Sequence, residues 1–229
     1  MAILEYKDNN NMFARSLSRR NRSDRSFQTA PLRIYNEDVV DYYKMALSSK
    51  DPYIKYISFY HILEYYYDEV FKTKLIADLK NKITHPSFSY KDNDKLYDLA
   101  SFIKNRWKAN SEDGQGNELE SLKYVLEEYI DITELQTRIE AYDNSSISYY
   151  ANNKVPFSNA PVIHFSDATG IITSLSKRIY FTRNALVHSK SSRDNKRYKP
   201  YKNEVELNKE IPLIQAIAEL VIINSSSNL

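Results

Sequence analysis

The chain has 229 residues, of which 42% are hydrophobic and 27% are charged, and its formal net charge is +2. This length is enough for one sizeable core, or for one domain with an arm, and no apolar run approaches the ~20 residues of a membrane-spanning helix. The absence of cysteine excludes a disulfide framework and thiolate metal sites, and the polar N-terminal region offers no signal-peptide core. We therefore expect a cytoplasmic protein without a membrane partner.

Glycine is scarce, with three residues in the whole chain. Folds that are rich in hairpins and tight turns use glycine freely, because it adopts positive φ without strain. Together with long segments of 3.6-residue periodicity, this scarcity predicts an all-α fold. It also excludes the Gly-rich loops that bind nucleotide phosphates.

The N-terminal segment, residues 1–33, is polar and basic and shows no sustained apolar period. We expect an extended or disordered arm there, followed by a single helical domain over residues 34–229. The first helix of that domain is predicted to begin after Asn36, which would act as its N-cap. A second helix is predicted to begin at Pro52 with Asp51 as its cap.

This second helix, expected over residues 52–72, is apolar or aromatic nearly all round, which is typical of a central, buried helix. Within it His61, Glu64 and Asp68 fall on one face. Buried polar groups need partners, so this stripe indicates either a core network or a catalytic cleft.

The remaining helices are predicted from their apolar spacing and from capping residues. They cover 75–83, a segment from Asn93 or Asp94 to Trp107, 119–130, 135–139, a segment from Ser166 or Asp167 to Lys190, and a last helix from about Pro212. Residues 110–117 are predicted to form a loop, and residues 143–167 an irregular connection.

Basic side chains concentrate at two places. Residues 1–33 hold seven, and residues 177–202 hold nine against the single acidic residue Asp194. Such clusters favour a polyanionic partner such as RNA, although basic runs are often solvated surface.

The second basic cluster contains the stretch Arg183-Asn184-Ala185-Leu186-Val187-His188. An arginine can hold a phosphate with two hydrogen bonds, and a histidine can move a proton near neutral pH. These are the groups that metal-free cleavage of a phosphodiester beside a 2′-hydroxyl requires. The alternative is that Arg183 makes a salt bridge and His188 sits at the C-terminal end of the helix.

The segment 180–188, the aromatic helix over 53–67 and the stretches 197–200 and 210–213 together resemble HEPN domains. The resemblance implies an all-α, antiparallel helical bundle with extra helices, no cofactor, and a metal-independent endoribonuclease acting in anti-phage defence or as a toxin. The family's usual tyrosine two positions after the histidine is replaced by Lys190. The alternative is a non-catalytic HEPN module that binds RNA or a partner protein.

The resemblance also assigns roles. Arg183 would hold the scissile phosphate, His188 would act as general acid and base, and Asn184 would orient His188. Glu64, supported by His61, would steady the pair from the facing helix. The expected RNA-binding residues are Lys190, Arg193, Lys196, Arg197 and Lys199. An antitoxin or another defence-system partner is possible, and no metal is expected.

The spacing of the motif sets a geometric condition. Residues five apart on a helix lie about 140° apart, so Arg183 and His188 do not share a face. They would meet one phosphate only if Arg183 reached round the helix, or if a second protomer supplied the other half of the site. We therefore expect a two-fold homodimer with its axis beside this helix.

Overall fold

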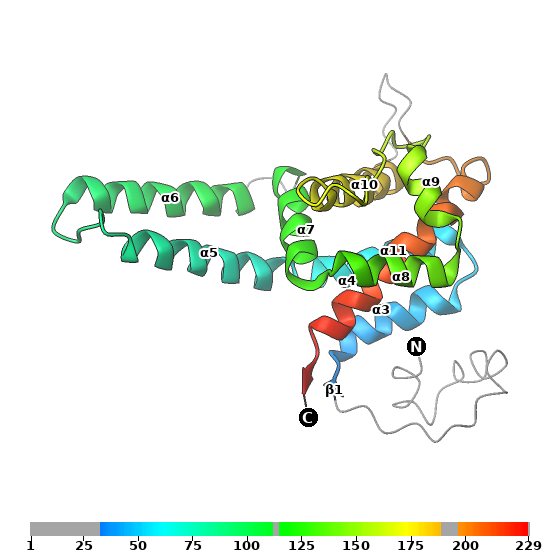
Figure 1. The fold of residues 1–229 in the computed structure, drawn as a ribbon, viewed down its shortest axis with the longest axis horizontal. Coiled ribbons are helices and arrows are strands. Elements are labelled where there is room, and N and C mark those ends of the chain that lie inside the picture. Colours follow the sequence, from blue (N-terminus) through cyan, green and yellow to red (C-terminus); the bar gives the residue numbers. More distant parts are fainter. Residues whose placement is uncertain (1–32, 112–114, 189–196, 229) are drawn as a thin grey trace.

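The computed structural model describes residues 33–111, 115–188 and 197–228, and this part of the chain is almost entirely helical (Figure 1). The predicted all-α fold is confirmed, whereas the predicted N-terminal arm lies outside the described residues except for Arg33. The helices are α3 (Glu37–Ser48), α4 (Pro52–Tyr65), α5 (Tyr67–Thr84), α6 (Asn93–Ser111), α7 (Gln115–Tyr129), α8 (Ile132–Tyr142), α9 (Ser146–Asn152), α10 (Ile171–Val187) and α11 (Glu204–Asn224).

The two ends of the described chain meet in a short antiparallel pair of strands, β1 (Arg33–Ile34) and β2 (Ser227–Asn228). The Arg33 side chain strengthens this closure, because it donates to the Ile223 carbonyl at 2.7 Å. None of the described helices combines the length and the hydrophobicity that crossing a bilayer requires.

The first two helices begin where capping chemistry predicts. The Asn36 side chain accepts hydrogen bonds from the backbone N–H groups of Asp38 and Val39, at 3.0 and 3.3 Å. The Asp51 side chain accepts from the Tyr53 N–H at 2.8 Å, with Pro52 in the first turn. Both caps satisfy backbone donors that the helix itself leaves free.

The prediction of one helix over residues 52–72 is wrong, because α4 ends at Tyr65. The backbone N–H of Tyr66 bonds to the Leu63 carbonyl at 3.2 Å, which tightens the turn, and α5 then begins at Tyr67. Neither glycine nor proline marks this break, so composition gives no signal for it. As a result α5 is one continuous helix to Thr84, in place of the short helix predicted over 75–83.

Further boundaries also differ from the predictions; for example, α10 begins at Ile171 and ends at Val187, inside the predicted limits. The short helix α9 lies inside the connection predicted to be irregular, and its Tyr150 is fully buried. The last helix begins at Glu204, so Pro212 lies inside α11. The proline removes one hydrogen bond to the Asn208 carbonyl, and Asn208 is exposed to solvent, which makes the loss tolerable.

The core is built around α4 and α11, which pack side by side, with α3, α7, α8 and α10 around them (Figure 1). Leu63 of α4 and Ile217 of α11 are fully buried. The expectation that the aromatic helix is central therefore holds for α4. The hairpin of α5 and α6 is different, because it projects away from this body and only the first half of α5 packs against α7.

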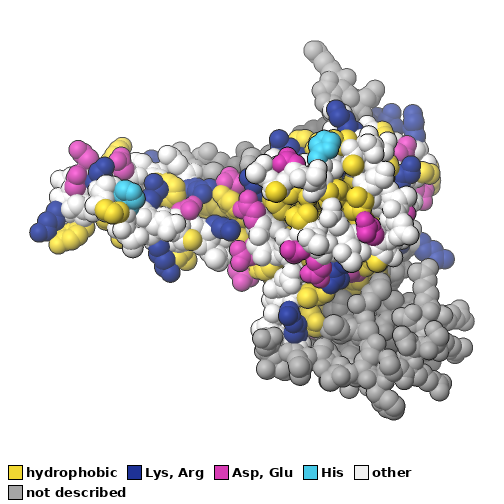
Figure 2. Space-filling model, in the orientation of Figure 1, with side chains coloured by type: hydrophobic (Ala, Val, Ile, Leu, Met, Phe, Trp, Pro, Cys, Tyr) yellow, Lys and Arg dark blue, Asp and Glu magenta, His cyan; other side chains and the backbone are white. Residues whose placement is uncertain are grey.

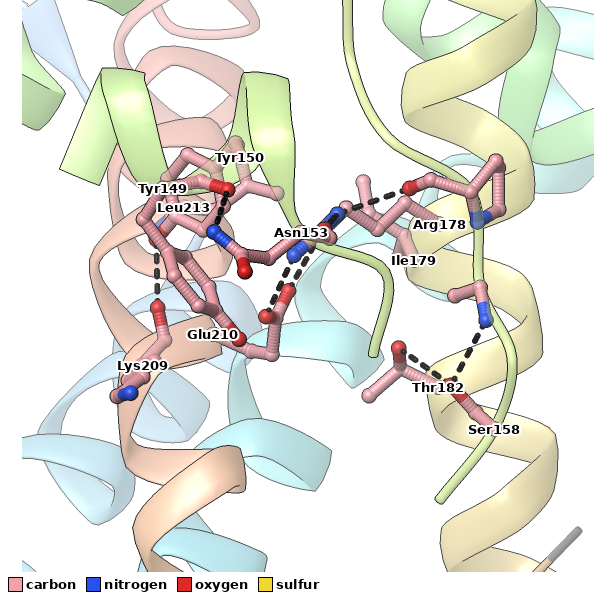
Figure 3. A network of polar contacts seen from close by, with 12 residues as sticks. Tyr149, Tyr150, Asn153, Ser158, Arg178, Ile179, Thr182, Lys209, Glu210 and Leu213 are labelled. Atoms are coloured by element: carbon pink, nitrogen blue, oxygen red, sulfur yellow. Dashed lines mark hydrogen bonds and ion pairs between the residues drawn. The ribbon is translucent and has the colours of Figure 1, made fainter. Parts of the chain in front are cut away.

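A fully buried ion pair fixes α10 to α11 (Figure 3). Arg178 is 0% exposed, and its guanidinium donates two hydrogen bonds of 2.8 Å to the carboxylate of Glu210, which is 1% exposed. The other terminal nitrogen donates to the carbonyls of Asn153 and Pro161, each at 2.8 Å. One side chain thus holds two helices and the irregular segment between α9 and α10.

Tyrosine side chains complete this network. The Tyr150 ring lies 5.0 Å from the Arg178 guanidinium, while its hydroxyl donates to the Lys209 carbonyl at 2.7 Å and accepts from the Leu213 N–H at 3.2 Å. Burial raises the pKa of the Glu210 carboxyl above its ordinary value, against the opposing effect of Arg178. The pair therefore depends on both charges being present.

We predict that Arg178→Met lowers the free energy of unfolding by about 3–5 kcal/mol, because it leaves the buried Glu210 carboxylate without its cation. The double variant Arg178→Met/Glu210→Leu should recover part of this loss. Recovery should be incomplete, since the Asn153 and Pro161 carbonyls still lack their donor. Urea denaturation measures both effects, with Lys123→Met on the surface as the control. A single variant as stable as the wild type would contradict the assigned role of the pair.

Candidate functional site

The predicted cluster assembles around Arg183. Its guanidinium lies between two carboxylates, 2.9 Å from Glu64 of α4 and 3.1 Å from Glu118 of α7. The three side chains are 16%, 25% and 26% exposed, in the order Arg183, Glu64 and Glu118. The arginine also lies over the Tyr60 ring, 5.2 Å from its centroid. Glu118 was missed in the sequence because it lies 65 residues from Arg183, in an ordinary helical pattern.

The other predicted site residues surround this centre. His61 contacts the second oxygen of Glu64 at 2.7 Å, and the Asn184 side-chain oxygen accepts from Arg183 at 3.2 Å. His188 is exposed at the C-cap of α10, where its backbone N–H bonds to the Asn184 carbonyl. Asn184 therefore directs its side chain to Arg183, while its backbone holds the His188 turn.

The electrostatics of the cluster favour a structural ion pair. Burial raises the pKa of the Glu118 carboxyl, although the charge of Arg183 opposes the shift. Burial also disfavours the charged form of Arg183, but Tyr60 and the two carboxylates hold the pKa of the guanidinium above its ordinary value. A phosphate at Arg183 would have to displace two carboxylates and then lie beside them. This arrangement matches the alternative in which Arg183 makes salt bridges and His188 ends the helix.

The predicted RNA-binding loop is largely outside the described residues, which include neither Lys190 nor Arg193 nor Lys196. At its end, the Lys199 backbone N–H donates to the Asn203 side chain at 3.0 Å, where a tight turn leads into α11. Within the described part of the chain, no group of three acidic or histidine side chains is placed to hold a metal ion.

Apart from this cluster, a pocket that the sequence did not reveal lies between the start of α4 and the turn before α11. It has a volume of about 320 Å³ and is lined by Lys50, Asp51, Tyr198, Pro200, Tyr201 and Glu204. We refer to it as the aromatic–acidic pocket. The sequence had identified Asp51 only as a helix cap, which it also is.

Tyr198 forms the fixed wall of this pocket. Its ring packs between Tyr53 and Phe157, with centroids 6.1 and 5.5 Å away, and its backbone N–H donates to the Ala185 carbonyl at 2.8 Å. Burial raises the pKa of the Tyr198 hydroxyl, and the charges of three nearby carboxylates raise it further. These carboxylates belong to Asp51, Glu204 and Glu206.

Tyr201 also lines the pocket. Its φ of 65° lies in the left-handed region, and the Lys202 N–H bonds across it to the Pro200 carbonyl at 2.7 Å. Such a γ-turn is strained for a tyrosine, and the side chain is 94% exposed. Strained residues of this kind often occur at ligand-binding sites. The turn therefore holds an aromatic ring in solvent at the rim of the pocket.

We predict that Arg183→Met costs about 1–3 kcal/mol of stability, less than loss of a fully buried pair, because Glu64 and Glu118 keep partial access to water. Adding Glu118→Gln should restore part of the loss by removing the repulsion between the two carboxylates. His188→Ala should change stability by less than about 0.5 kcal/mol, because its ring is exposed. Urea denaturation at neutral pH measures all three variants.

The pH dependence of the same variants provides a check. The folded-state pKa of Glu118 is raised, so protonation of this group favours the folded state, and that contribution is lost as the pH rises through the raised pKa. The destabilisation caused by Arg183→Met should therefore shrink between pH 7 and about pH 4, as the carboxylates take up protons. A penalty independent of pH would show that charge is not its cause.

Comparison with known proteins corrects the resemblance inferred from the motif. No curated protein and no solved structure matches the chain. A family model described as methylamine utilization protein MauJ matches residues 39–223, from α3 into α11. The HEPN resemblance is therefore wrong, and so is the assignment as a HEPN ribonuclease in anti-phage defence.

The short Arg-x4-His motif does not by itself identify a nuclease site. An arginine and a histidine at this spacing are equally suited to a salt bridge and to the end of a helix. The expected partners, namely RNA, a second copy and a defence-system protein, stay predictions. Since the family model covers most of the chain, this protein belongs to the MauJ family, described as methylamine utilization proteins.

Proposed function

We propose that this protein serves methylamine utilisation by binding a small organic ammonium ion in the aromatic–acidic pocket. The observation that carries the proposal is the lining of this pocket, in which carboxylates and tyrosine rings surround one small space. The family's description supports the choice of ligand, because methylamine is an ammonium ion at neutral pH.

The charge of the pocket favours a cation. Asp51, Glu204 and Glu206 all lie close enough to Tyr198 to raise its pKa, whereas Lys50 is the one cationic side chain of the lining. Glu206 is not part of the lining, and it acts on the pocket through its charge alone.

The walls favour an organic ammonium ion over a metal ion. Ammonium groups bind against the faces of tyrosine rings, and their methyl groups make apolar contacts there. Metal ions of the oxygen-binding class need several carboxylate or carbonyl oxygens around one point. The lining offers two carboxylates, Asp51 and Glu204, and no three acidic or histidine side chains of the described residues converge as metal ligands.

The size of methylammonium limits the affinity. Very small ligands gain at most about 1.5 kcal/mol per non-hydrogen atom, so two such atoms correspond to a dissociation constant no tighter than roughly 6 mM. Larger methylated ammonium ions should bind more tightly, because they contact more of both tyrosine rings. This weak binding calls for an NMR titration.

We predict that methylammonium chloride shifts the backbone amide resonances of the 198–204 turn, with saturation at tens of millimolar, relative to sodium chloride at equal ionic strength. Asp51→Asn combined with Glu204→Gln should weaken binding at least about tenfold, because both changes remove negative charge. Asparagine caps helices as well as aspartate does, so α4 should remain intact. Lys50→Met should strengthen binding by removing a competing ammonium group.

The matched control is Glu140→Gln, since Glu140 is an exposed carboxylate of α8 remote in sequence from the pocket. It should leave the titration unchanged. Equal shifts with sodium chloride, or equal affinity in the Asp51→Asn/Glu204→Gln variant, would rule out the proposed site.

A further inference from the structure

The free end of the α5–α6 hairpin contains a cavity that the proposed ammonium binding does not use. It lies between the last turn of α5, the first turns of α6 and their connection, and we refer to it as the hairpin cavity. Its volume of about 420 Å³ is within the range of small-molecule sites. Figure 2 shows basic, histidine, acidic and hydrophobic side chains beside one another toward this end of the hairpin.

Two lysines from different helices line the hairpin cavity, and neither forms an ion pair with a carboxylate of the described residues. Lys82 of α5 lies over the Phe102 ring of α6, with its Nζ 4.5 Å from the ring centroid. This contact holds the ammonium group between the two helices. Lys95 of α6 is half-buried. A half-buried ammonium group without a counter-ion gains from an anion that replaces its lost hydration.

His85, the C-cap of α5, adds a hydrogen-bond donor to the lining. Its Nδ1 accepts from the Ser87 backbone N–H at 3.2 Å and lies 2.7 Å from the Ser87 hydroxyl. A ring nitrogen that accepts from a backbone N–H carries no hydrogen, so the hydrogen of the neutral imidazole is on Nε2. The connection between the helices thereby fixes the tautomer in which His85 offers Nε2–H to a ligand.

The charge and the apolar surface of the hairpin cavity define the ligand that fits it. The two lysines are opposed by one carboxylate in the lining, that of Asp98, which leaves one net positive charge while His85 is neutral. An anion with a single charge matches this lining better than a phosphate dianion. Phe88 and Leu99 supply the apolar part of the lining, and both are half-buried.

We propose that the hairpin cavity binds a small organic monocarboxylate, with its carboxylate near Lys82, Lys95 and the Nε2–H of His85. Its apolar body contacts Phe88 and Leu99. An ion that is charged at one end and apolar at the other satisfies both parts of the lining at once. This site is independent of the proposed ammonium binding, because the two pockets share no residue and select opposite charges.

An NMR titration of the whole chain with sodium benzoate tests the proposal. Benzoate should shift the backbone amide resonances of residues 87–88 and 95–99 relative to sodium chloride at equal ionic strength. The dissociation constant should be in the millimolar range, because an open pocket gives a small ligand little free energy per atom. Benzamide has the same shape without the charge and should bind at least about tenfold more weakly. Methylammonium chloride should leave these resonances unchanged, which separates this test from that of the aromatic–acidic pocket.

Variants of the lining test the role of charge. Lys95→Gln should weaken benzoate binding at least about tenfold, because it removes the half-buried ammonium group and keeps a helix-forming side chain. Lys95→Arg should retain binding, and Asp98→Asn should tighten it by removing the opposing carboxylate. The matched control is Lys80→Gln, which removes the same charge from an exposed position of α5 outside the lining and should bind benzoate nearly as well as the wild type. Circular dichroism verifies that each variant stays helical.

Three results overturn the proposal. They are benzamide binding as tight as that of benzoate, equal benzoate affinity in Lys95→Gln and the wild type, and an absence of shifts at about 50 mM benzoate. Tighter binding of inorganic phosphate than of benzoate overturns the choice of a monocarboxylate. The comparison of benzoate with benzamide uses the wild type, so it decides the matter even if a variant loses its helical structure.

Discussion

The buried ion pair between Arg178 and Glu210 is the constraint on which the arrangement of the body depends. Neither charge can exist in the core without the other, so α10 and α11 are held at one relative position. The same guanidinium ties down the chain around Asn153 and Pro161. The start of α11, which brings Glu204 to the aromatic–acidic pocket, follows from this position. A polar interaction thus sets the geometry within which the apolar core packs.

Much of the fold could be predicted because the signals were local. Asn36 and Asp51 cap the helices they were expected to cap, and the central position of α4 follows from its uniformly apolar surface. The break at Tyr66 could not be predicted, since no glycine or proline causes it. It arises where α4 leaves the core and α5 turns toward α7, and that is a tertiary effect.

The candidate site shows the same division. Arg183, Glu64, His61 and Asn184 were expected near one another, and the structure places them in contact. The pattern could not predict the contribution of Glu118, which lies on α7. Because its carboxylate pairs with Arg183, a potential phosphate ligand becomes part of a satisfied ion pair. The aromatic–acidic pocket was equally hidden, because its walls come from a helix cap and a distant turn. The spacing of a motif indicates which of its residues can come into contact. Their chemistry also depends on further partners from other helices, such as Glu118 here.

The uncovered hairpin has a consequence for how this protein unfolds. Two segments unfold together when they share buried contacts. None of the side chains in residues 76–106 is buried in the core. The tip of the hairpin is therefore expected to open more readily than its base, which is tied to the body by the continuous helix α5 and by the contacts of Arg106 with Glu120 and Tyr124 of α7.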